Sequence, residues 1–125
     1  MWDILELTPF QDWYEGLDEQ AREDIAAYLM VLAQMGPSLG RPYADTLQAS
    51  RFPNMKELRV QSAGRPLRVL FAFDPLRNAV LLIGGDKTGD KRFYKRMIPI
   101  ADALFETYLA GEEHHGVRKT KTGDA

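Results

Sequence analysis

The sequence contains no cysteine and only two histidines, His114 and His115, which lie close to its end. Without cysteine, disulfides and thiolate metal sites are excluded. The two histidines are adjacent, whereas zinc-binding histidines on a helix stand four residues apart. No histidine falls within the part that is predicted to fold, so a histidine-based nucleophilic triad is not expected. We therefore expect a protein without metal and without cofactor.

Long apolar runs are also absent. No stretch approaches the roughly 20 apolar residues that cross a bilayer, and the opening residues 2–7 lack the basic start of a signal peptide. Neither GxGxxG nor a P-loop occurs; residues 84–89 have the composition of a phosphate-binding loop but not its spacing. We expect a soluble, cytoplasmic protein that does not engage a membrane.

Charge is unevenly distributed along the 125 residues, 45% of which are hydrophobic, enough for the core of one domain. Residues 1–40 hold eight acids and one base, residues 41–100 hold twelve bases and five acids, and residues 101–125 hold three bases and five acids. One interpretation is a basic face for a polyanion, with the acidic face turned away. The alternative is that the acids cap helices while the bases line strand exteriors, and both stay open here.

The first 36 residues are predicted to form a strand and a helical hairpin. Residues 2–7 alternate with the period of a strand, and Thr8-Pro9 can begin a short helix that runs to Gly16. Asp18 is a predicted N-cap for a second helix, which Gly36 ends. The apolar residues of this helix recur at three- and four-residue spacing and predict one buried stripe: Ala21, Ile25, Tyr28, Leu29, Leu32 and Met35.

Three strands are predicted after a loop over residues 38–54, which has room for one helical turn. The strand-like runs are 55–62, 67–74 and 79–85, and the short turns between them predict an antiparallel meander. In the second run, alternation sends Leu67, Val69, Phe71 and Phe73 to the core. The other face of the meander is then expected to be the outer face, and both Arg59 and Arg68 lie on it.

A helical pattern starts near Lys91 and ends at Gly111, and Pro99 is expected to kink or restart it. The fold class predicted for residues 1–111 is α+β. Its small antiparallel sheet, an N-terminal strand plus a three-stranded meander, packs against the N-terminal helical hairpin and the C-terminal helix. Residues 112–125 are polar and are predicted to be a disordered tail.

A basic segment with interleaved aromatic residues follows the third strand of the meander. Such a pattern suits RNA, because cations meet phosphate and a ring can stack on an unpaired base. The alternative is a solvated helix face with Phe93 in the core. For Arg68, a cross-strand ion pair with Glu57 is likewise an alternative to catalysis. The bases of this segment are Lys87, Lys91, Arg92, Lys95 and Arg96, and its aromatic residues are Phe93 and Tyr94.

Three segments together resemble a known family. They are Lys56-Glu57-Leu58-Arg59-Val60, the run from Gly64 through Arg68 to Phe73, and Leu82-Ile83-Gly84-Gly85-Asp86-Lys87-Thr88-Gly89-Asp90-Lys91-Arg92-Phe93-Tyr94. This sequence is similar to the HigB-like, phage-related branch of the RelE/ParE toxin superfamily, whose members are toxins of type II toxin–antitoxin pairs. The similarity extends over about residues 2–110.

The resemblance implies a metal-independent endoribonuclease that inhibits translation by cutting mRNA on the ribosome, with a helix-turn-helix antitoxin as partner and an oligomer formed with it. In that reaction the ribose 2′-OH attacks the adjacent phosphate. By the resemblance, Arg68, Tyr94, Lys87 and Arg59 are the catalytic candidates. The RNA-binding candidates are Lys56, Lys91, Arg92, Lys95 and Arg96.

One departure from the family pattern keeps a second function open. RelE-type toxins carry lysines that point outward from the first strand of the meander, whereas Met55 and Glu57 hold these positions here. Lys56 points inward by strict alternation. The alternative function is that of a toxin relative without nuclease activity, such as a ParE-like inhibitor that binds gyrase.

Overall fold

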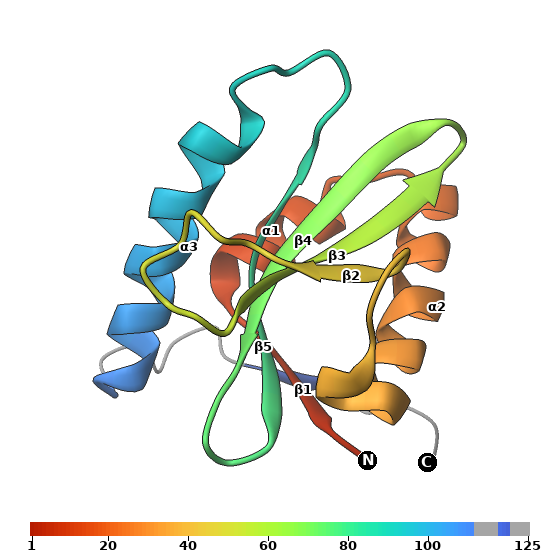
Figure 1. The fold of residues 1–125 in the computed structure, drawn as a ribbon. Coiled ribbons are helices and arrows are strands. Elements are labelled where there is room, and N and C mark those ends of the chain that lie inside the picture. The colour runs from red at the N-terminus through yellow and green to blue at the C-terminus, as the bar shows by residue number, and fades with distance from the viewer. Residues whose placement is uncertain (112–117, 121–125) are drawn as a thin grey trace.

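The computed structural model describes residues 1–111 and the backbone of residues 118–120 (Figure 1). The strands of this part lie in one sheet with the order β2-β3-β4-β5-β1-β6. β1 runs parallel to β5, and every other neighbouring pair is antiparallel. The predicted α+β class, with an N-terminal strand beside a meander, is confirmed. The strands are β1 (Asp3–Glu6), β2 (Ala44–Thr46), β3 (Met55–Ser62), β4 (Arg65–Phe73), β5 (Asn78–Asp86) and β6 (Arg118–Thr120).

The helices begin and end close to their predicted positions. They are α1 (Thr8–Glu15), α2 (Glu19–Met35) and α3 (Phe93–Leu109), and a 3-10 turn η1 (Gly36–Ser38) follows α2. Asp18 is the N-cap of α2, since its Oδ1 accepts a hydrogen bond from the Ala21 amide at 2.9 Å. At the other end Gly36 has φ of 58° and lies against the Trp2 indole, where a Cβ would clash at 2.3 Å.

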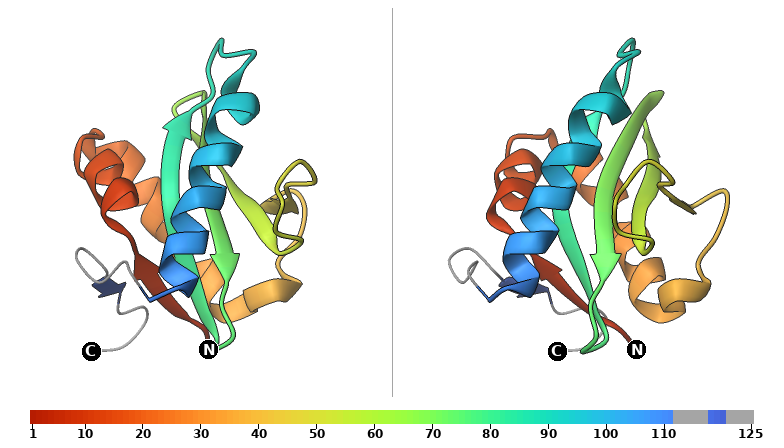
Figure 2. Two further views of the ribbon diagram at one scale, coloured as in Figure 1. Left: turned by 90° about the vertical axis from the view of Figure 1, so that its left-hand side faces the viewer. Right: turned by 60° about the vertical axis from the view of Figure 1, so that its left-hand side comes forward.

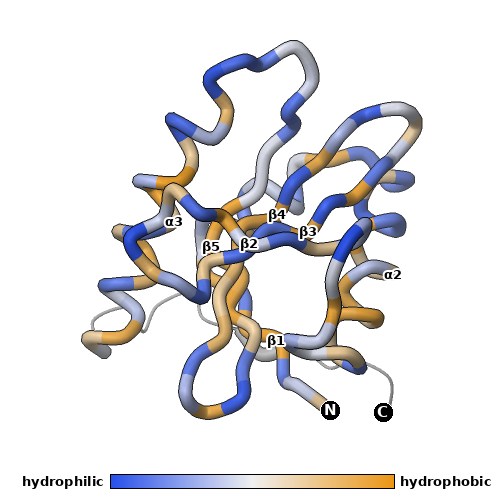
Figure 3. Tube along the Cα trace, viewed as in Figure 1, coloured by the Kyte–Doolittle hydropathy of each residue, from blue (hydrophilic) through white to orange (hydrophobic). Residues whose placement is uncertain are grey.

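Helices cover both faces of the sheet: α1 and α2 pack on one face and α3 packs on the other (Figure 2). The first core joins Phe10 and Ile25 to Val69, and the second joins Phe93 and Phe105 to Leu70. Hydrophobic residues accordingly follow the strands, whereas the β5–α3 connection is mostly hydrophilic (Figure 3).

The second core corrects the expectation that one face of the meander is an outer face. Leu70 and Ala72, which alternation sends to that face, are completely buried beneath α3. Arg68 lies on the same face and is only 4% exposed. The prediction failed because alternation separates the two faces of a strand but does not say whether a helix covers the second one.

Several boundaries also differ from the predictions. The segment expected to be a loop contains η1 and the short strand β2. α3 starts at Phe93 and continues through Pro99, so the helix does not restart there. The predicted disordered tail, with both histidines, lies mostly outside the described residues. Within it, Arg118–Thr120 pair with β1 as β6, which the sequence analysis did not anticipate.

Two adjacent glycines of β5 let helices approach from both sides. A Cβ on Gly84 would lie 2.2 Å from the Trp13 ring of α1, and a Cβ on Gly85 would lie 2.8 Å from the Phe93 ring of α3. These glycines therefore serve helix–sheet packing.

The loop between β2 and β3 is anchored to α3. Oδ1 of Asp102 accepts a hydrogen bond from the Ser50 hydroxyl at 2.5 Å, and Oδ2 accepts one from the Arg51 amide at 3.1 Å. Phe52 packs edge-on against Phe105 with 5.1 Å between ring centroids. This anchoring fixes the loop beside the middle and second half of α3.

Candidate active site

Three polar side chains from two strands and a helix meet on the α3 face of the sheet. The Tyr94 hydroxyl, in the first turn of α3, donates a hydrogen bond to Oε1 of Glu57 on β3 at 2.7 Å. Nε of Arg68 on β4 lies 3.4 Å from the Tyr94 oxygen and 3.5 Å from Oε1 of Glu57. The ion pair between Arg68 and Glu57 that the sequence allowed is therefore present, and it is almost completely buried.

Two further cations adjoin this trio. Arg59, which alternation placed on the same face as Arg68, lies directly opposite it across β3 and β4 and is partly exposed. The Lys87 ammonium lies 5.6 Å from the centroid of the Tyr94 ring. The four catalytic candidates, Arg59, Arg68, Lys87 and Tyr94, are thus brought together with Glu57. We call these five residues the polar cluster.

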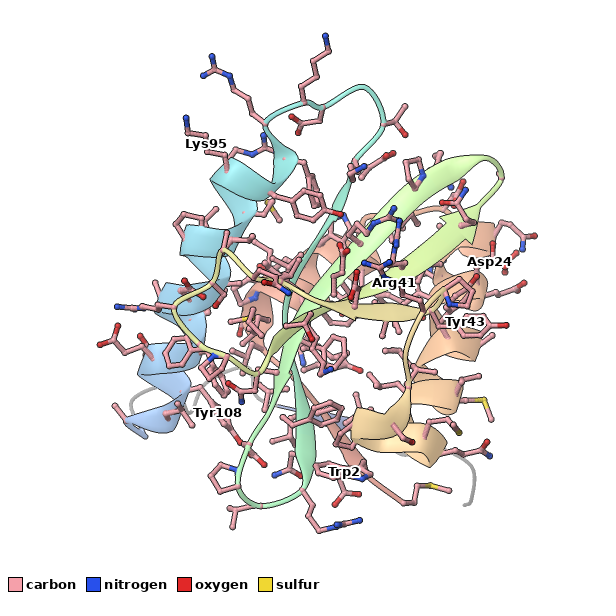
Figure 4. The ribbon with its side chains drawn as sticks, in the orientation of Figure 1. Trp2, Asp24, Arg41, Tyr43, Lys95 and Tyr108 are labelled. Atoms are coloured by element: carbon pink, nitrogen blue, oxygen red, sulfur yellow. The ribbon has the colours of Figure 1, made fainter. Side chains whose placement is uncertain are left out.

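Arg41 is a neighbouring cation that the sequence analysis did not single out. Its Nη2 pairs with Oδ2 of Asp45 at 3.0 Å, and Asp45 is the direct cross-strand neighbour of Glu57. In Figure 4 Arg41 projects in front of the middle of the sheet. The i, i+4 spacing of Arg41 and Asp45 could have indicated their ion pair. It could not have placed the pair beside Glu57, because β2 is too short to be recognised as a strand by alternation.

The environment of the polar cluster is electrostatically positive, with two carboxylates beside four cations. The hydrogen bond from Arg41 is the main reason why the pKa of Asp45 is lowered. Burial first, and then the hydrogen bond to Glu57, raise the pKa of Tyr94, which Arg68 opposes. The phenol therefore keeps its proton at neutral pH and can donate it. The cations are Arg41, Arg59, Arg68 and Lys87, and the carboxylates are Asp45 and Glu57.

The first turn of α3 and the two residues before it carry the remaining basic segment. Lys91 and Arg92 precede the helix, Lys95 and Arg96 lie in its first turn, and all four are exposed. Arg96 forms an ion pair with Asp90 at 2.7 Å, which raises the pKa of Arg96. Phe93 is buried in the second core, so the alternative that assigned this ring to packing is correct. Tyr94 is then the aromatic side chain of this segment that reaches the polar cluster.

Lys56 is not brought to the polar cluster. It is the cross-strand neighbour of Thr46, and its Nζ lies 3.4 Å from the Thr46 hydroxyl. Since successive residues of a strand point to opposite faces, Lys56 lies on the face opposite Glu57. β3, the first strand of the meander, therefore has no lysine on the face that α3 covers.

Three of the hollows in the described part of the chain are lined by members of the polar cluster or of the basic segment. A groove of ≈ 400 Å³ contains two members of the polar cluster and is lined by Tyr28, Pro42, Tyr43, Arg59, Gln61 and Arg68. A second hollow of ≈ 420 Å³ lies between α3 and the β2–β3 loop and is lined by Ala49, Arg51, Tyr94, Lys95, Ile98, Pro99 and Asp102. The third, of ≈ 320 Å³, is lined by Arg92, Lys95 and Arg96.

The described residues contain neither a metal-binding cluster nor a helix suited to cross a membrane. Residues 1–111 and 118–120 contain no group of three or more histidine, cysteine or acidic side chains placed to hold a metal ion. None of the helices in this part of the chain is both long enough and apolar enough to span a membrane.

Comparison with known proteins places this chain in a family. It is 45% identical to "Putative toxin HigB3" of Mycobacterium tuberculosis over 90% of this chain and 98% of that protein. It is 43% identical to "Putative toxin HigB2" of the same organism over 87% of this chain and 55% of that longer protein. No solved structure matches.

These similarities confirm the resemblance to HigB-like toxins, and the α+β architecture is compatible with the RelE-like fold. The family model of phage-derived Gp49-like proteins matches residues 12–106, a range that includes the whole polar cluster. The chain therefore belongs to the Gp49-like family of phage-derived proteins.

Proposed function

We propose that this protein is the toxin of a type II toxin–antitoxin pair, and that it is a metal-independent endoribonuclease which cuts mRNA on the ribosome. The names of the two relatives support the toxin assignment. The observation that carries the enzymatic assignment is the polar cluster, in which a buried carboxylate, a protonated phenol and three cations converge. Phosphoryl transfer needs such groups, because charge develops on the phosphate oxygens.

In the proposed reaction the 2′ oxygen forms a bond to phosphorus while the bond from phosphorus to the 5′ oxygen breaks. The products are a 2′,3′-cyclic phosphate and a free 5′-OH. Arg59 and Arg68 neutralise the phosphate oxygens as the phosphorus becomes five-coordinate. Each preorganised donor of this kind contributes roughly 3 kcal/mol to transition-state stabilisation.

Two protons must move in this reaction. The Tyr94 oxygen takes the 2′ proton as its own proton passes to Oε1 of Glu57, across the hydrogen bond of 2.7 Å. The Lys87 ammonium, beside the Tyr94 ring, supplies a proton to the leaving 5′ oxygen. Solvent then restores both groups. Glu57 thus takes the role for which RelE-type toxins use outward lysines.

The proposed partners follow from charge. Exposed Lys91, Arg92, Lys95 and Arg96 extend the cationic surface from the polar cluster, and they are suited to the phosphates of mRNA and ribosomal RNA. The resemblance adds a helix-turn-helix antitoxin as the protein that neutralises this surface. A short neighbouring gene that encodes such a protein, and that abolishes growth arrest when coexpressed, would support this assignment.

The direct test is induction in a bacterial host without the antitoxin. We expect growth arrest, with new 5′ ends inside the coding region of a translated reporter mRNA, mapped by primer extension. A reporter without a start codon is the control, and it should remain uncut. The alternative function, gyrase binding, predicts intact mRNA and relaxed plasmid DNA in the same cells, and that result would overturn the nuclease proposal.

A further inference from the structure

Two of the hollows are each lined by at least one member of the polar cluster. Arg68 lines the groove of ≈ 400 Å³, and Tyr94 lines the hollow of ≈ 420 Å³ beside α3. These two lining residues are in contact, since Nε of Arg68 lies 3.4 Å from the Tyr94 oxygen. Tyr43 and Lys95, one from each hollow, lie on opposite sides of the molecule in Figure 4, with Arg41 between them. A phosphate at the polar cluster would therefore have one hollow on each side.

The groove on the side of β2 offers an aromatic surface. Tyr43 is 47% exposed, although its ring is held in an edge-on contact with Tyr28 at 6.0 Å between centroids. Arg59 and Arg68 line the same groove and place cations next to the ring. An exposed, supported ring beside phosphate-binding cations is the arrangement with which proteins bind an unpaired base by stacking.

The hollow on the side of α3 is lined by the apolar residues Ala49, Ile98 and Pro99. Lys95 and Tyr94, a member of the polar cluster, also line it. One wall is the β2–β3 loop, which the hydrogen bonds to Asp102 hold in place. Both hollows fall within the range of small-ligand sites, about 300–1,000 Å³. A flat apolar group with a neighbouring phosphate matches this lining.

We propose that these two hollows bind the two nucleosides that flank the scissile phosphate, one base stacked on Tyr43 and the other beside Ala49 and Pro99. This inference rests on the proposed nuclease function and adds to it a pair of base-binding sites. It explains why an exposed tyrosine stands next to the cationic groove. It also assigns the anchored β2–β3 loop to substrate binding.

The test uses the full-length protein and a 2′-O-methyl RNA tetranucleotide, which is not cleaved because its 2′ oxygens are blocked. The fluorescent base 2-aminopurine is placed on one side of the central phosphate or on the other. We expect its fluorescence to be quenched on binding at either position. Tyr43→Leu should weaken binding about tenfold, as the loss of one base–aromatic stack does, and abolish quenching at one position only. Ala49→Phe, which fills the other hollow, should abolish quenching at the other position.

Matched controls separate these effects from folding. Tyr43→Phe keeps the ring and should behave as the parent, and Ala26→Phe adds the same bulk as Ala49→Phe at an exposed site of α2. If Tyr43→Leu and Ala49→Phe bind and quench like Ala26→Phe while the parent cuts mRNA, the base-binding sites are refuted and the nuclease stands. If the position-specific losses occur but the parent cuts no mRNA, the base-binding sites stand and the proposed reaction fails.

Discussion

The Tyr94 phenol and the Glu57 carboxylate, 37 residues apart in sequence, share a hydrogen bond of 2.7 Å on the α3 face of the sheet. This contact links the first turn of α3 to β3. It also directs the Tyr94 proton towards Glu57, so that a lone pair of the phenol oxygen is left for another partner. Arg68 beside them keeps the carboxylate paired. The contact is therefore both a structural link and a route for a proton.

Removing one charge of the buried pair should cost more stability than removing both. Arg68→Ala would leave the buried Glu57 carboxylate without its cation and should lower the free energy of unfolding by about 3–5 kcal/mol. The combination Glu57→Gln with Arg68→Met should recover most of this loss. Urea unfolding measures both variants, and equal destabilisation of the single and the double variant would contradict the prediction. The cost arises because Arg68, which was expected on the outer face of the meander, is buried.

Tyr94→Phe should abolish growth arrest and reduce mRNA cleavage by about 10²-fold or more, because it removes the proton carrier and keeps the ring. Tyr108→Phe is a matched control on the same helix, since the Tyr108 hydroxyl donates to Oδ2 of Asp74 at 2.5 Å. The control should lose about 1 kcal/mol of stability and remain active. Primer extension at equal levels of soluble protein measures both, and an equal loss in the two variants would assign Tyr94 a structural role.

Stability should fall in acid as Asp74 is protonated. Burial acts to raise the pKa of Asp74, but hydrogen bonds from Tyr108, Asn78 and the backbone outweigh it and lower the pKa from its ordinary value. A carboxyl group whose pKa is lower in the folded state stabilises the fold above its unfolded pKa. That stabilisation is lost as the pH falls through the folded pKa. The melting temperature of Asp74→Asn should therefore lie below that of the parent at neutral pH and approach it in acid. A constant difference at every pH would refute the assignment.

Gly84→Ala should destabilise the fold by about 1–3 kcal/mol, because the added Cβ would lie 2.2 Å from the Trp13 ring. Gly40→Ala is the matched control, since no atom lies within 4 Å of a Cβ placed there. Thermal melting compares the two variants. If Gly84→Ala melts like Gly40→Ala, α1 does not pack on β5 as closely as described.

Features that depend on neighbouring residues could be predicted from the sequence. Asp18 and Gly36 mark the ends of α2 by local hydrogen bonding and backbone geometry. The short turns predicted the antiparallel meander, and alternation placed Arg59 and Arg68 on one face of it. The placement of α3 depends on contacts with distant residues. The burial of Leu70 and Arg68 was therefore missed, and the convergence of Tyr94 on Glu57 was not foreseen.

The site was only partly predictable for the same reason. The resemblance supplied Arg68, Tyr94, Lys87 and Arg59, which the fold brings together. Arg41 was missed because the three-residue strand that positions it has no detectable alternation. The two hollows were not predictable, since each is lined by side chains from segments far apart in the sequence.

The parallel pairing of β1 with β5 has a consequence for how the protein is made. β1 precedes β5 by about 70 residues in the chain, so the pairing of Asp3 with Asn78 cannot form until β5 has been synthesised. The polar cluster is completed later still, because Tyr94 follows β5. We therefore expect a nascent chain to remain inactive until α3 has been synthesised and docks on the sheet.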